Sequence, residues 1–283
     1  MNPIKRLIVR SEKDYASRNI CDALRSQGGW DDCGSDGLCT YFRRDEDMLM
    51  CLPEKHLYSD DLDRRAAAFG FRPDVVIFPS VHSSESGMPA LTAHPIGNFN
   101  EAVYGGRDRE LVPAAPAVMS SMLRSIAGKC RMPEFNVCFE VTHHGPWLET
   151  PTMFLEIGSD LPNWTRAEAG GLQAEVIRDT EPSEGFPVLI GVGGGHYAPR
   201  FTEVALGFRA DFGHMLPNYQ MEGKDDEEIS RMLRSAADAS GTELAYLHRK
   251  SMKGPQAQRL KALGESLGLE WVRSEDLEPL TGN

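Results

Sequence analysis

Histidines follow three short apolar runs of the sequence, each near the point where the run breaks off into a turn. The runs and their histidines are residues 75–78 with His82, residues 137–139 with His143 and His144, and residues 188–192 with His196. Each run is rich in β-branched or aromatic residues and bounded by Gly, Pro or Ser, which is typical of a buried strand of a parallel sheet. Because ligands of open α/β sheets bind beyond the carboxyl ends of the strands, we expect these imidazoles to meet in one crevice. Imidazoles gathered in this way indicate metal binding or acid–base catalysis.

Metal binding would need ligands that are scattered along the chain, because the sequence has no HExxH spacing. The candidate ligands are five histidines in or beside Gly-, Pro- and Ser-rich turns and one in a predicted loop: His82, His94, His143, His144, His196 and His214. A single histidine is more often a packed or exposed residue, but packing does not explain several at strand ends. Since neighbours on a strand point to opposite faces, we expect one of His143 and His144 in the crevice and the other in an orienting role.

Two glutamates interrupt apolar runs that we interpret as strands. Glu140 lies in the run that ends at His143, and Glu156 lies in the run at residues 154–157. A carboxylate in a buried strand is costly unless an imidazole, an arginine, a metal or a helix N-terminus pairs with it. Each is therefore a candidate metal ligand or general base, Glu156 more than Glu140, and the alternative is an ion pair at a strand end.

The glycines at 193–195 follow a predicted strand and can bring backbone N–H groups close to a phosphate or a developing oxyanion. The turn matches neither GxGxxG nor GxxxxGK[ST], so dinucleotide or ATP binding is not supported. The sequence also lacks a GxSxG elbow, which argues against a serine hydrolase of the usual α/β kind. Ser83, beside His82, is a candidate hydrogen-bonding group or nucleophile, although filling of a polar loop is the simpler explanation.

The elements that would position these residues alternate between strands and helices. We expect strands at residues 4–9, 48–52, 74–78, 90–93, 152–157, 188–192, 243–247 and 270–272, one more ending at residue 143, and helices at 13–25, 61–69, 116–127, 166–178, 226–239 and 256–267. This order predicts an α/β fold with a single doubly wound, mostly parallel or mixed sheet and helices on both faces. We expect residues 27–47 to be an irregular insertion, a surface loop or hairpin, and residues 1–283 to form one domain.

Composition restricts the compartment and the partners. The chain of 283 residues has six cysteines without a CxxC pair, and its N-terminus lacks a signal peptide, so we expect a reducing cytoplasm. No apolar run approaches the roughly 20 residues that cross a bilayer. The formal charge of -12 argues against nonspecific coating of nucleic acid. Two basic clusters remain, and either alone fits a solvated helix face. They are Arg124, Lys129 and Arg131, and Arg249, Lys250, Lys253, Arg259 and Lys261.

Five short segments, in one order, closely resemble the archaeal and plant type of D-aminoacyl-tRNA deacylase. They are HSSESG at residues 82–87, LTAHPIGNF at 91–99, THHGP at 142–146, FLEIGS at 154–159 and GGGHYAP at 193–199. The resemblance is dense from His82 to His214 and looser at the flanks, where Asp14, Asn19 and the pair Arg249-Lys250 match. Residues 27–47 depart from the family pattern. So does Val81, at a position that is often basic, which leaves no cation there for a phosphate contact.

The resemblance implies hydrolysis of the ester that joins a D-amino acid to the 3′ end of tRNA, a proofreading activity in translation that uses zinc. It also implies a fold similar to peptidyl-tRNA hydrolase and the nucleoside phosphorylases. An activated ester needs a positioned water, a base or metal that deprotonates it, and donors for the oxyanion, but no covalent nucleophile. The expected catalytic residues are His82, His143, His196 and Glu156. His94, Glu156 and His214 are expected to orient or ligate, and Ser83, Asn98, Gly194, Gly195, Tyr197 and Lys250 to contact substrate.

Other functions stay open at this point. One alternative is a metal-dependent hydrolase or a nucleoside phosphorylase-like enzyme that acts on a free small molecule. Another is a tRNA-binding protein without catalysis. For the deacylase, we expect the two basic clusters to hold the acceptor stem by its phosphates, the protein to need no membrane, and the assembly to be a monomer or a homodimer.

Overall fold

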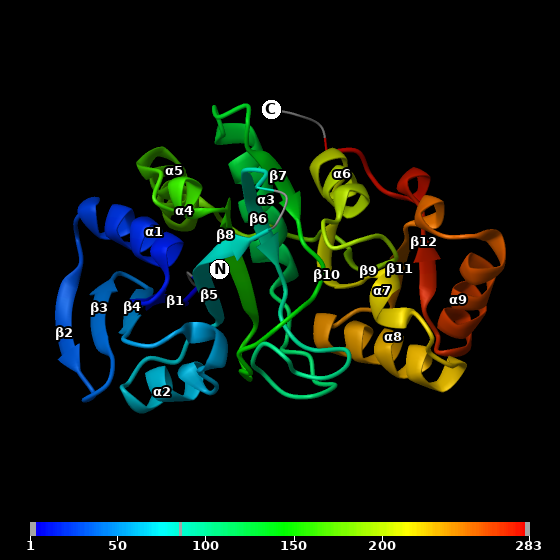
Figure 1. Ribbon diagram of the computed structural model, residues 1–283, viewed down its shortest axis with the longest axis horizontal. Coiled ribbons are helices and arrows are strands. Elements are labelled where there is room, and N and C mark those ends of the chain that lie inside the picture. Colours follow the sequence, from blue (N-terminus) through cyan, green and yellow to red (C-terminus); the bar gives the residue numbers. More distant parts are fainter. Residues whose placement is uncertain (1–3, 85–86, 281–283) are drawn as a thin grey trace.

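The computed structural model describes residues 4–84 and 87–280 (Figure 1). Residues 85 and 86 of the segment HSSESG therefore lie outside the described part. All six cysteines are free thiols. Among the described residues, no helix is both long and apolar enough to cross a bilayer, and the longest, α8 (Asp226–Ser240), has 15 residues.

The larger of two sheets has eight strands in the order β2-β3-β4-β1-β5-β8-β6-β7. They are β1 (Arg6–Ser11), β2 (Asp31–Ser35), β3 (Thr40–Arg44), β4 (Asp47–Leu52), β5 (Val75–Ser83), β6 (Ala90–His94), β7 (Asn136–Phe139) and β8 (Thr152–Ser159). Strands β4, β1, β5 and β8 run parallel to one another, as do β6 and β7. Strand β6 is antiparallel to β8, and β2, β3 and β4 form an antiparallel meander, so the sheet is mixed.

The smaller sheet is wholly parallel, in the order β10-β9-β11-β12. Its strands are β9 (Val188–Val192), β10 (Asp211–Leu216), β11 (Leu244–Leu247) and β12 (Glu270–Val272). The predicted α/β class and predominance of parallel pairing are confirmed, but the expectation of one continuous sheet is wrong. Buried parallel strands are similar apolar runs in whichever sheet they lie, so the sequence does not assign them. One core cluster joins Ile8 and Leu155 of the first sheet to Leu189 and Phe212 of the second. A domain count of one stays a prediction.

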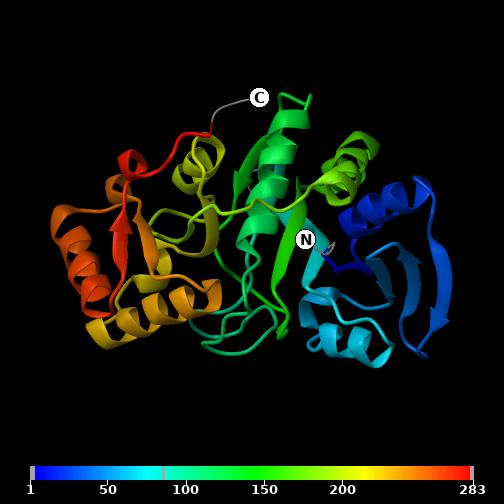
Figure 2. The same ribbon diagram turned by 180° about the vertical axis from the view of Figure 1, so that it is seen from behind.

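Helices cover both faces of the larger sheet, as expected (Figures 1 and 2). The main helices are α1 (Tyr15–Ser26), α2 (Leu62–Ala68), α3 (Pro116–Lys129), α5 (Ala167–Asp179), α6 (Pro199–Gly207), α8 and α9 (Gly254–Ser266), with short helices α4 (Leu161–Trp164) and α7 (Asn218–Met221). Side chains alternate along β1, so Ile8 packs with Ile20 of α1, whereas Leu7 and Val9 pack with Leu62 of α2.

Residues 27–47 are not an irregular insertion. Strands β2 and β3 form a hairpin that extends the larger sheet beyond β4, so the hairpin alternative is confirmed. All five residues of β2, Asp31–Ser35, are exposed. An edge strand that buries no side chain shows no apolar alternation, which is why the sequence gives no strand signal there.

Three strand boundaries differ from prediction, and each moves a site residue. Strand β5 continues through Ser83 because its polar end pairs with β8, so His82 lies inside the strand and not in a turn after it. Strand β7 ends at Phe139, which places Glu140 just beyond it. His214 lies within β10 and is fully buried, whereas the sequence predicted a loop.

Candidate active site

A cavity of about 510 Å³ lies where the predicted histidines meet. His82, His143, His144 and His196 line it together with Glu156. The ring centroids of His82 and His196 are 5.9 Å apart, and those of His143 and His196 are 4.7 Å apart. The expected meeting of imidazoles from three distant runs is therefore confirmed.

The site lies over the middle of β8 and not beyond one shared edge of the sheet. Glu156 stands inside this strand, paired in register with Ser80 of β5 on one side and Thr92 of β6 on the other. Its carboxylate is 3.5 Å from His82 Nδ1 and 3.6 Å from His94 Nε2. Because β5 runs parallel and β6 antiparallel to β8, their carboxyl ends lie on opposite sides of Glu156 along that strand. The expectation of a single common rim is thus wrong, although the side chains do converge.

Glu140 is the central carboxylate of the site, a role the sequence ranked below that of Glu156. It is fully buried, one residue beyond β7, where an isolated backbone bridge joins it to Tyr197. Its oxygens lie 3.1 Å from His82 Nδ1, 2.8 Å from His196 Nε2 and 3.7 Å from His143 Nε2. One carboxylate therefore contacts all three histidines that we expected to activate water.

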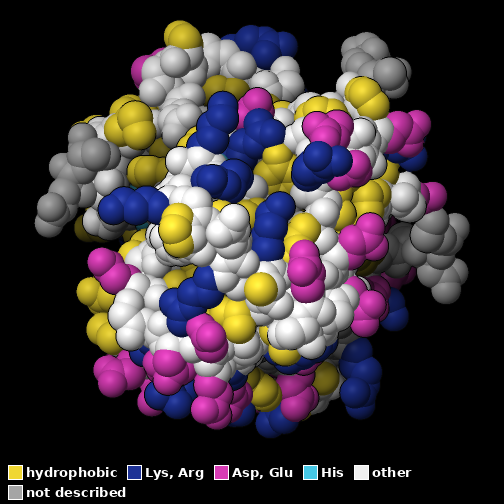
Figure 3. Space-filling view, turned by 90° about the vertical axis from the view of Figure 1, so that its right-hand side faces the viewer, with side chains coloured by type: hydrophobic (Ala, Val, Ile, Leu, Met, Phe, Trp, Pro, Cys, Tyr) yellow, Lys and Arg dark blue, Asp and Glu magenta, His cyan; other side chains and the backbone are white. Residues whose placement is uncertain are grey.

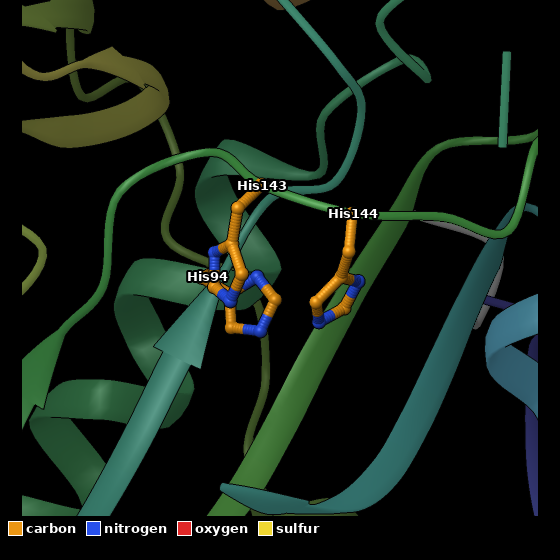
Figure 4. A group of neighbouring side chains, drawn as sticks. All are labelled: His94, His143 and His144. Atoms are coloured by element: carbon orange, nitrogen blue, oxygen red, sulfur yellow. The ribbon is translucent and has the colours of Figure 1, made fainter. Parts of the chain in front are cut away.

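A second group consists of His94, His143 and His144 (Figure 4). Ring centroids are 4.2 Å apart for His94 and His143 and 5.0 Å apart for His94 and His144. The expectation that His143 and His144 point to different places is wrong, because the strand has ended before them. His144 has a left-handed backbone with φ of 46°, and the chain leaves the strand alternation there.

The Nδ1 atoms of these three histidines all donate to backbone carbonyl oxygens. A carbonyl only accepts, so each Nδ1 carries a proton, and in the neutral rings of His143 and His144 the Nε2 lone pair is free. Burial lowers the pKa of His94, but contacts with Glu156 outweigh burial and raise it, so a cation bound at His94 Nε2 would displace a proton. The acceptors for His94, His143 and His144 are Pro95 at 3.1 Å, Val141 at 2.7 Å and Gly145 at 2.7 Å. This backbone support is the arrangement that orients metal-binding imidazoles in proteins.

Charge is distributed unequally among the histidines. Burial by itself lowers the pKa of His82, but contacts with Glu140 and Glu156 outweigh burial and raise it to about 11. Burial, together with the charge of His94, lowers the pKa of His143 to about 3.

Burial lowers the pKa of His144 well below its usual value. Glu140 has its pKa held well below normal, because His196 and His82 outweigh the cost of burying its charge. The protein thus holds His143 and His144 neutral and both carboxylates ionised.

The donor atoms fit a divalent cation such as zinc. Ligand atoms lie within 4.8 Å of one another in three sets: His94, His143 and His144; His82, Glu140 and His196; and His94, Glu140 and Glu156. His94 Nε2 and both oxygens of Glu140 are buried without a hydrogen-bond partner. The oxygens of Glu140 are close to imidazole nitrogens, but the directions are not those of hydrogen bonds, so distance alone does not satisfy them. Buried lone pairs that face one another are stabilised by a shared cation.

A further polar network beside the cavity was not predicted as part of the site. Ser80 Oγ donates to Asp14 Oδ2 at 3.1 Å and lies 3.2 Å from His56 Nε2, and all three residues line the cavity. Burial lowers the pKa of His56 to about 4, so its ring is neutral. Asp14 stood out in the sequence only through the family resemblance, and no local pattern marks His56 or Ser80.

The glycine turn is less open than expected. The amide of Gly194 donates to Ser251 Oγ at 2.9 Å, and that of Gly193 donates to the carbonyl of Leu216 at 2.8 Å. The assignment of Gly194 as an oxyanion donor is therefore wrong, because its N–H is already used. Gly195 is exposed, immediately before His196. A positive φ of 90° at Gly194 explains the need for glycine at that position.

Three of the residues that we predicted to contact substrate lie at the cavity or beside it. Tyr197 places its hydroxyl 2.8 Å from His82 Nε2, so it belongs to the same polar network. Ser83 is exposed and lines the cavity. Asn98 uses its amide nitrogen to hold a loop, donating to the carbonyl of Gly105 at 2.9 Å, and it lines a neighbouring cavity that also includes His143.

His214 is not a metal ligand candidate in this structure. Its Nε2 lies 2.9 Å from the carbonyl oxygen of Val112, and its Nδ1 lies 3.0 Å from the Thr142 hydroxyl. Both ring nitrogens are thus occupied within the core, and none of the three ligand sets includes them. The prediction was wrong because His214 sits in a strand and points into packed protein.

The two basic clusters differ in availability. Arg124 is largely buried and pairs with Asp211 at 3.0 Å, and Lys129 pairs with Glu175 at 2.8 Å, so the first cluster is not a free patch. The second runs from the turn at Arg249–Ser251 into α9, on a side of the molecule where Lys and Arg side chains gather (Figure 3), and within it Arg259 pairs with Asp226 at 2.6 Å. Lys250 and Lys253 are exposed and have no ion pair with any described residue. Lys250 lies in the 3₁₀ turn Arg249–Ser251, next to the glycine turn that leads to His196.

Comparisons with known proteins indicate one family. The family described as D-aminoacyl-tRNA deacylase matches residues 69–272. A D-aminoacyl-tRNA deacylase of Thermococcus onnurineus is 36% identical over 280 residues, covering 95% of this chain and 99% of that protein. One from Methanococcoides burtonii is 36% identical over 283 residues, covering 98% of this chain, and the chain spans 58% of that protein's length.

A solved structure shares the fold along nearly the whole chain. The crystal structure of AF0625, described as a conserved protein of unknown function, superposes with a TM-score of 0.88 and 30% sequence identity. The match covers 98% of this chain and 99% of the other. The sequence match, the fold and the histidine–glutamate site point to one assignment: this chain is a member of the D-aminoacyl-tRNA deacylase family.

Proposed function

We propose that this chain hydrolyses the ester bond of D-aminoacyl-tRNA, releasing the free D-amino acid and tRNA as a proofreading step in translation. The observation that carries the proposal is the group of histidines around Glu140 in a cavity whose rim is open to solvent. Water adds to the ester carbonyl, the carbonyl carbon–oxygen bond to the ribose breaks, and the ribose hydroxyl leaves with a proton. An aminoacyl ester needs no protein nucleophile for this reaction.

His196 is the group best placed to accept the proton from water. Its side chain is 40% exposed, whereas those of His82 and Glu140 are buried. Its Nε2 faces Glu140 at 2.8 Å, which leaves Nδ1 for the cavity. The charge of Glu140 at that distance stabilises the imidazolium that forms. His82, held protonated by Glu140 and Glu156, orients the Tyr197 hydroxyl, whose oxygen lies 2.8 Å from its Nε2.

Zinc is part of the proposal, with His94, His143 and His144 as its ligands. The Nδ1 atoms of all three imidazoles donate to backbone carbonyls, which leaves each Nε2 as the ligand atom, and three histidines with one open position are a known catalytic zinc arrangement. When bound, zinc would polarise the ester and lower the pKa of water. With or without zinc, Glu140 and His196 hold and move the proton that is taken from water.

The tRNA body is assigned to the exposed basic segment around Lys250 and Lys253. The hydrogen bond from Gly194 to Ser251 holds this segment against the turn that carries His196. A phosphate backbone bound there brings the 3′ end close to the cavity. We place the reaction in the cytoplasm, where charged tRNA is used, and leave monomer or homodimer as a prediction.

The test is release of amino acid from tRNA charged with D-tyrosine or L-tyrosine, before and after zinc is removed by a chelator. We expect release from the D-form only, loss of release after metal analysis confirms removal, and recovery on adding zinc. Equal release of both forms would contradict proofreading. Full activity in the stripped protein would contradict the role of zinc, and activity on free nucleosides alone would favour the phosphorylase-like alternative.

A further inference from the structure

The mouth of the catalytic cavity carries aromatic and basic side chains that the hydrolytic residues do not use. Five of them line the same cavity as the histidines: Lys13, Tyr15, Lys55, Tyr104 and Trp164. Tyr15 is 46% exposed and Tyr104 is 63% exposed. Large aromatic surfaces that stay open to solvent beside a polar site indicate a binding surface.

Tyr15 and Trp164 form a platform on one side of the mouth. Tyr15 begins α1 and Trp164 ends α4, and these helices lie side by side (Figure 1). The ring centroids are 6.4 Å apart and the ring planes differ by 12°. Trp164 Nε1 donates to the backbone carbonyl of His82 at 2.9 Å. The platform is therefore held at a defined position relative to a histidine of the site.

Cations surround this platform. The Arg18 guanidinium lies 4.9 Å from the centre of the Tyr15 ring. Lys55 is exposed and has no ion pair with any described residue. Lys13 pairs with Glu54 at 2.7 Å, but both side chains are exposed, and such pairs contribute little and exchange readily. Aromatic faces interleaved with cations are the pattern that binds single-stranded nucleic acid.

We infer that this platform stacks the 3′-terminal adenine of tRNA, while Lys55 and Lys13 contact the phosphate that precedes it. The inference rests on the proposed function. Hydrolysis requires the ester at His196, and the terminal base is separated from that ester only by the ribose, so it must lie near the cavity mouth. The 3′ end is unpaired, and stacking on aromatic rings is the usual way to hold an unpaired base. The platform thereby aligns the ester for attack without reading the amino acid.

The experiment measures binding of an RNA minihelix whose terminal adenosine carries D-tyrosine through an amide in place of the ester. The variants are Tyr15→Ala, which removes the ring, and Tyr15→Phe, which keeps it. Tyr58→Ala is the matched control, because Tyr58 is 60% exposed but does not line the cavity. A second minihelix lacks only the terminal adenine base.

We expect Tyr15→Ala to weaken binding roughly 5- to 150-fold, the range that corresponds to losing one stacked base. Tyr15→Phe and Tyr58→Ala should bind like the unchanged protein. Removing the adenine should weaken the unchanged protein similarly but should hardly weaken Tyr15→Ala further, because the two changes remove the same stacking interaction.

Two results would overturn the inference: full affinity in Tyr15→Ala, or an equal further loss on removing the adenine from both proteins. Circular dichroism establishes that each variant is folded. Failure of the proposed function would look different, since the unchanged protein would then release no D-tyrosine from the ester-linked minihelix whatever the platform does.

Discussion

Glu140 controls the protonation of the site at the scale of single residues. Its two oxygens address His82 and His196, and among the described residues no arginine or lysine forms an ion pair with it. The negative charge therefore has to be balanced by protons on imidazoles or by a cation. Its position just beyond β7 differs from the prediction, which placed Glu140 inside a strand that ends at His143.

Glu140→Gln tests this role while preserving size. We expect the turnover number to fall by about 100-fold or more, because His196 loses the charge that stabilises its protonated form and His82 loses a charge that keeps it protonated. The measurements are release of D-tyrosine at saturating tRNA and the melting temperature. Glu149→Gln, at an exposed pair with Arg64, is the control and should keep its turnover. Unchanged turnover in Glu140→Gln would contradict the assignment.

His214 makes stability depend on pH through a buried neutral ring. Burial lowers its pKa to about 4, from an ordinary value near 6.5 in the unfolded chain. Between pH 4 and pH 6.5 the unfolded state binds more protons than the folded state. The stability that the neutral ring contributes is therefore present above pH 6.5 and is lost as the pH falls toward 4. The shift corresponds to about 3 kcal/mol. In His214→Asn, the free energy of unfolding should fall less steeply between pH 6.5 and 4 than in the unchanged protein. Parallel curves would contradict this.

At the scale of elements, the segments that carry the histidines are joined by backbone hydrogen bonds. The amide of Gly97 donates to the carbonyl of His144 at 2.8 Å, and the amide of Val141 donates to the carbonyl of His196 at 3.0 Å. These bonds tie the turn after β6, the turn after β7 and the turn after β9 into one unit. Close approach of the backbones is therefore a condition for the site.

Gly97→Ala should break this unit. Gly97 has φ of 138°, and a Cβ there would lie 2.6 Å from the Cα of Leu111, which is backbone and has little freedom to move. We expect a loss of stability of more than about 1 kcal/mol and a clear fall in turnover. Gly128→Ala in α3, where a Cβ meets nothing within 4 Å, is the control and should be neutral or slightly stabilising. Equal melting temperatures for the two variants would count against the prediction.

On the scale of the whole molecule, a chain with a formal charge of -12 binds a polyanion only through a local arrangement of cations. In the first basic cluster Arg124 and Lys129 form internal ion pairs, whereas in the second Lys250 and Lys253 are exposed on an open face at the start of α9 and form none with the described residues. The open face continues to the turn beside His196 through Lys250. The proposal that tRNA binds here therefore rests on the location of these cations relative to the site, and not on net charge.

Neutralising this surface should weaken tRNA binding and its dependence on salt. For Lys250→Gln with Lys253→Gln, we expect lower affinity for uncharged tRNA and a salt slope reduced by about 2, because each lysine would neutralise one phosphate. Lys129→Gln is the control, because Lys129 on α3 pairs with Glu175. Affinity is measured by fluorescence anisotropy over a series of salt concentrations. The same loss of affinity in control and test variants would indicate a nonspecific effect.

The sequence by itself determined the chemical types at the site and most of the local elements. Strands such as β9 and β12 have the predicted bounds, because apolar runs and flanking glycines depend on neighbouring residues. The histidines at 82, 94, 143, 144 and 196 and the carboxylate of Glu156 were likewise recognisable, since they interrupt or end those runs.

Only the tertiary structure decided which of these groups touch. It placed Glu140 between His82 and His196, excluded His214, and brought Tyr15 to Trp164 across nearly 150 residues of chain. It also divided the strands between two sheets and ran β6 antiparallel to β8. The physical reason is that strand order and direction are set by the packing of whole faces, and the alternation along one strand is the same in either direction.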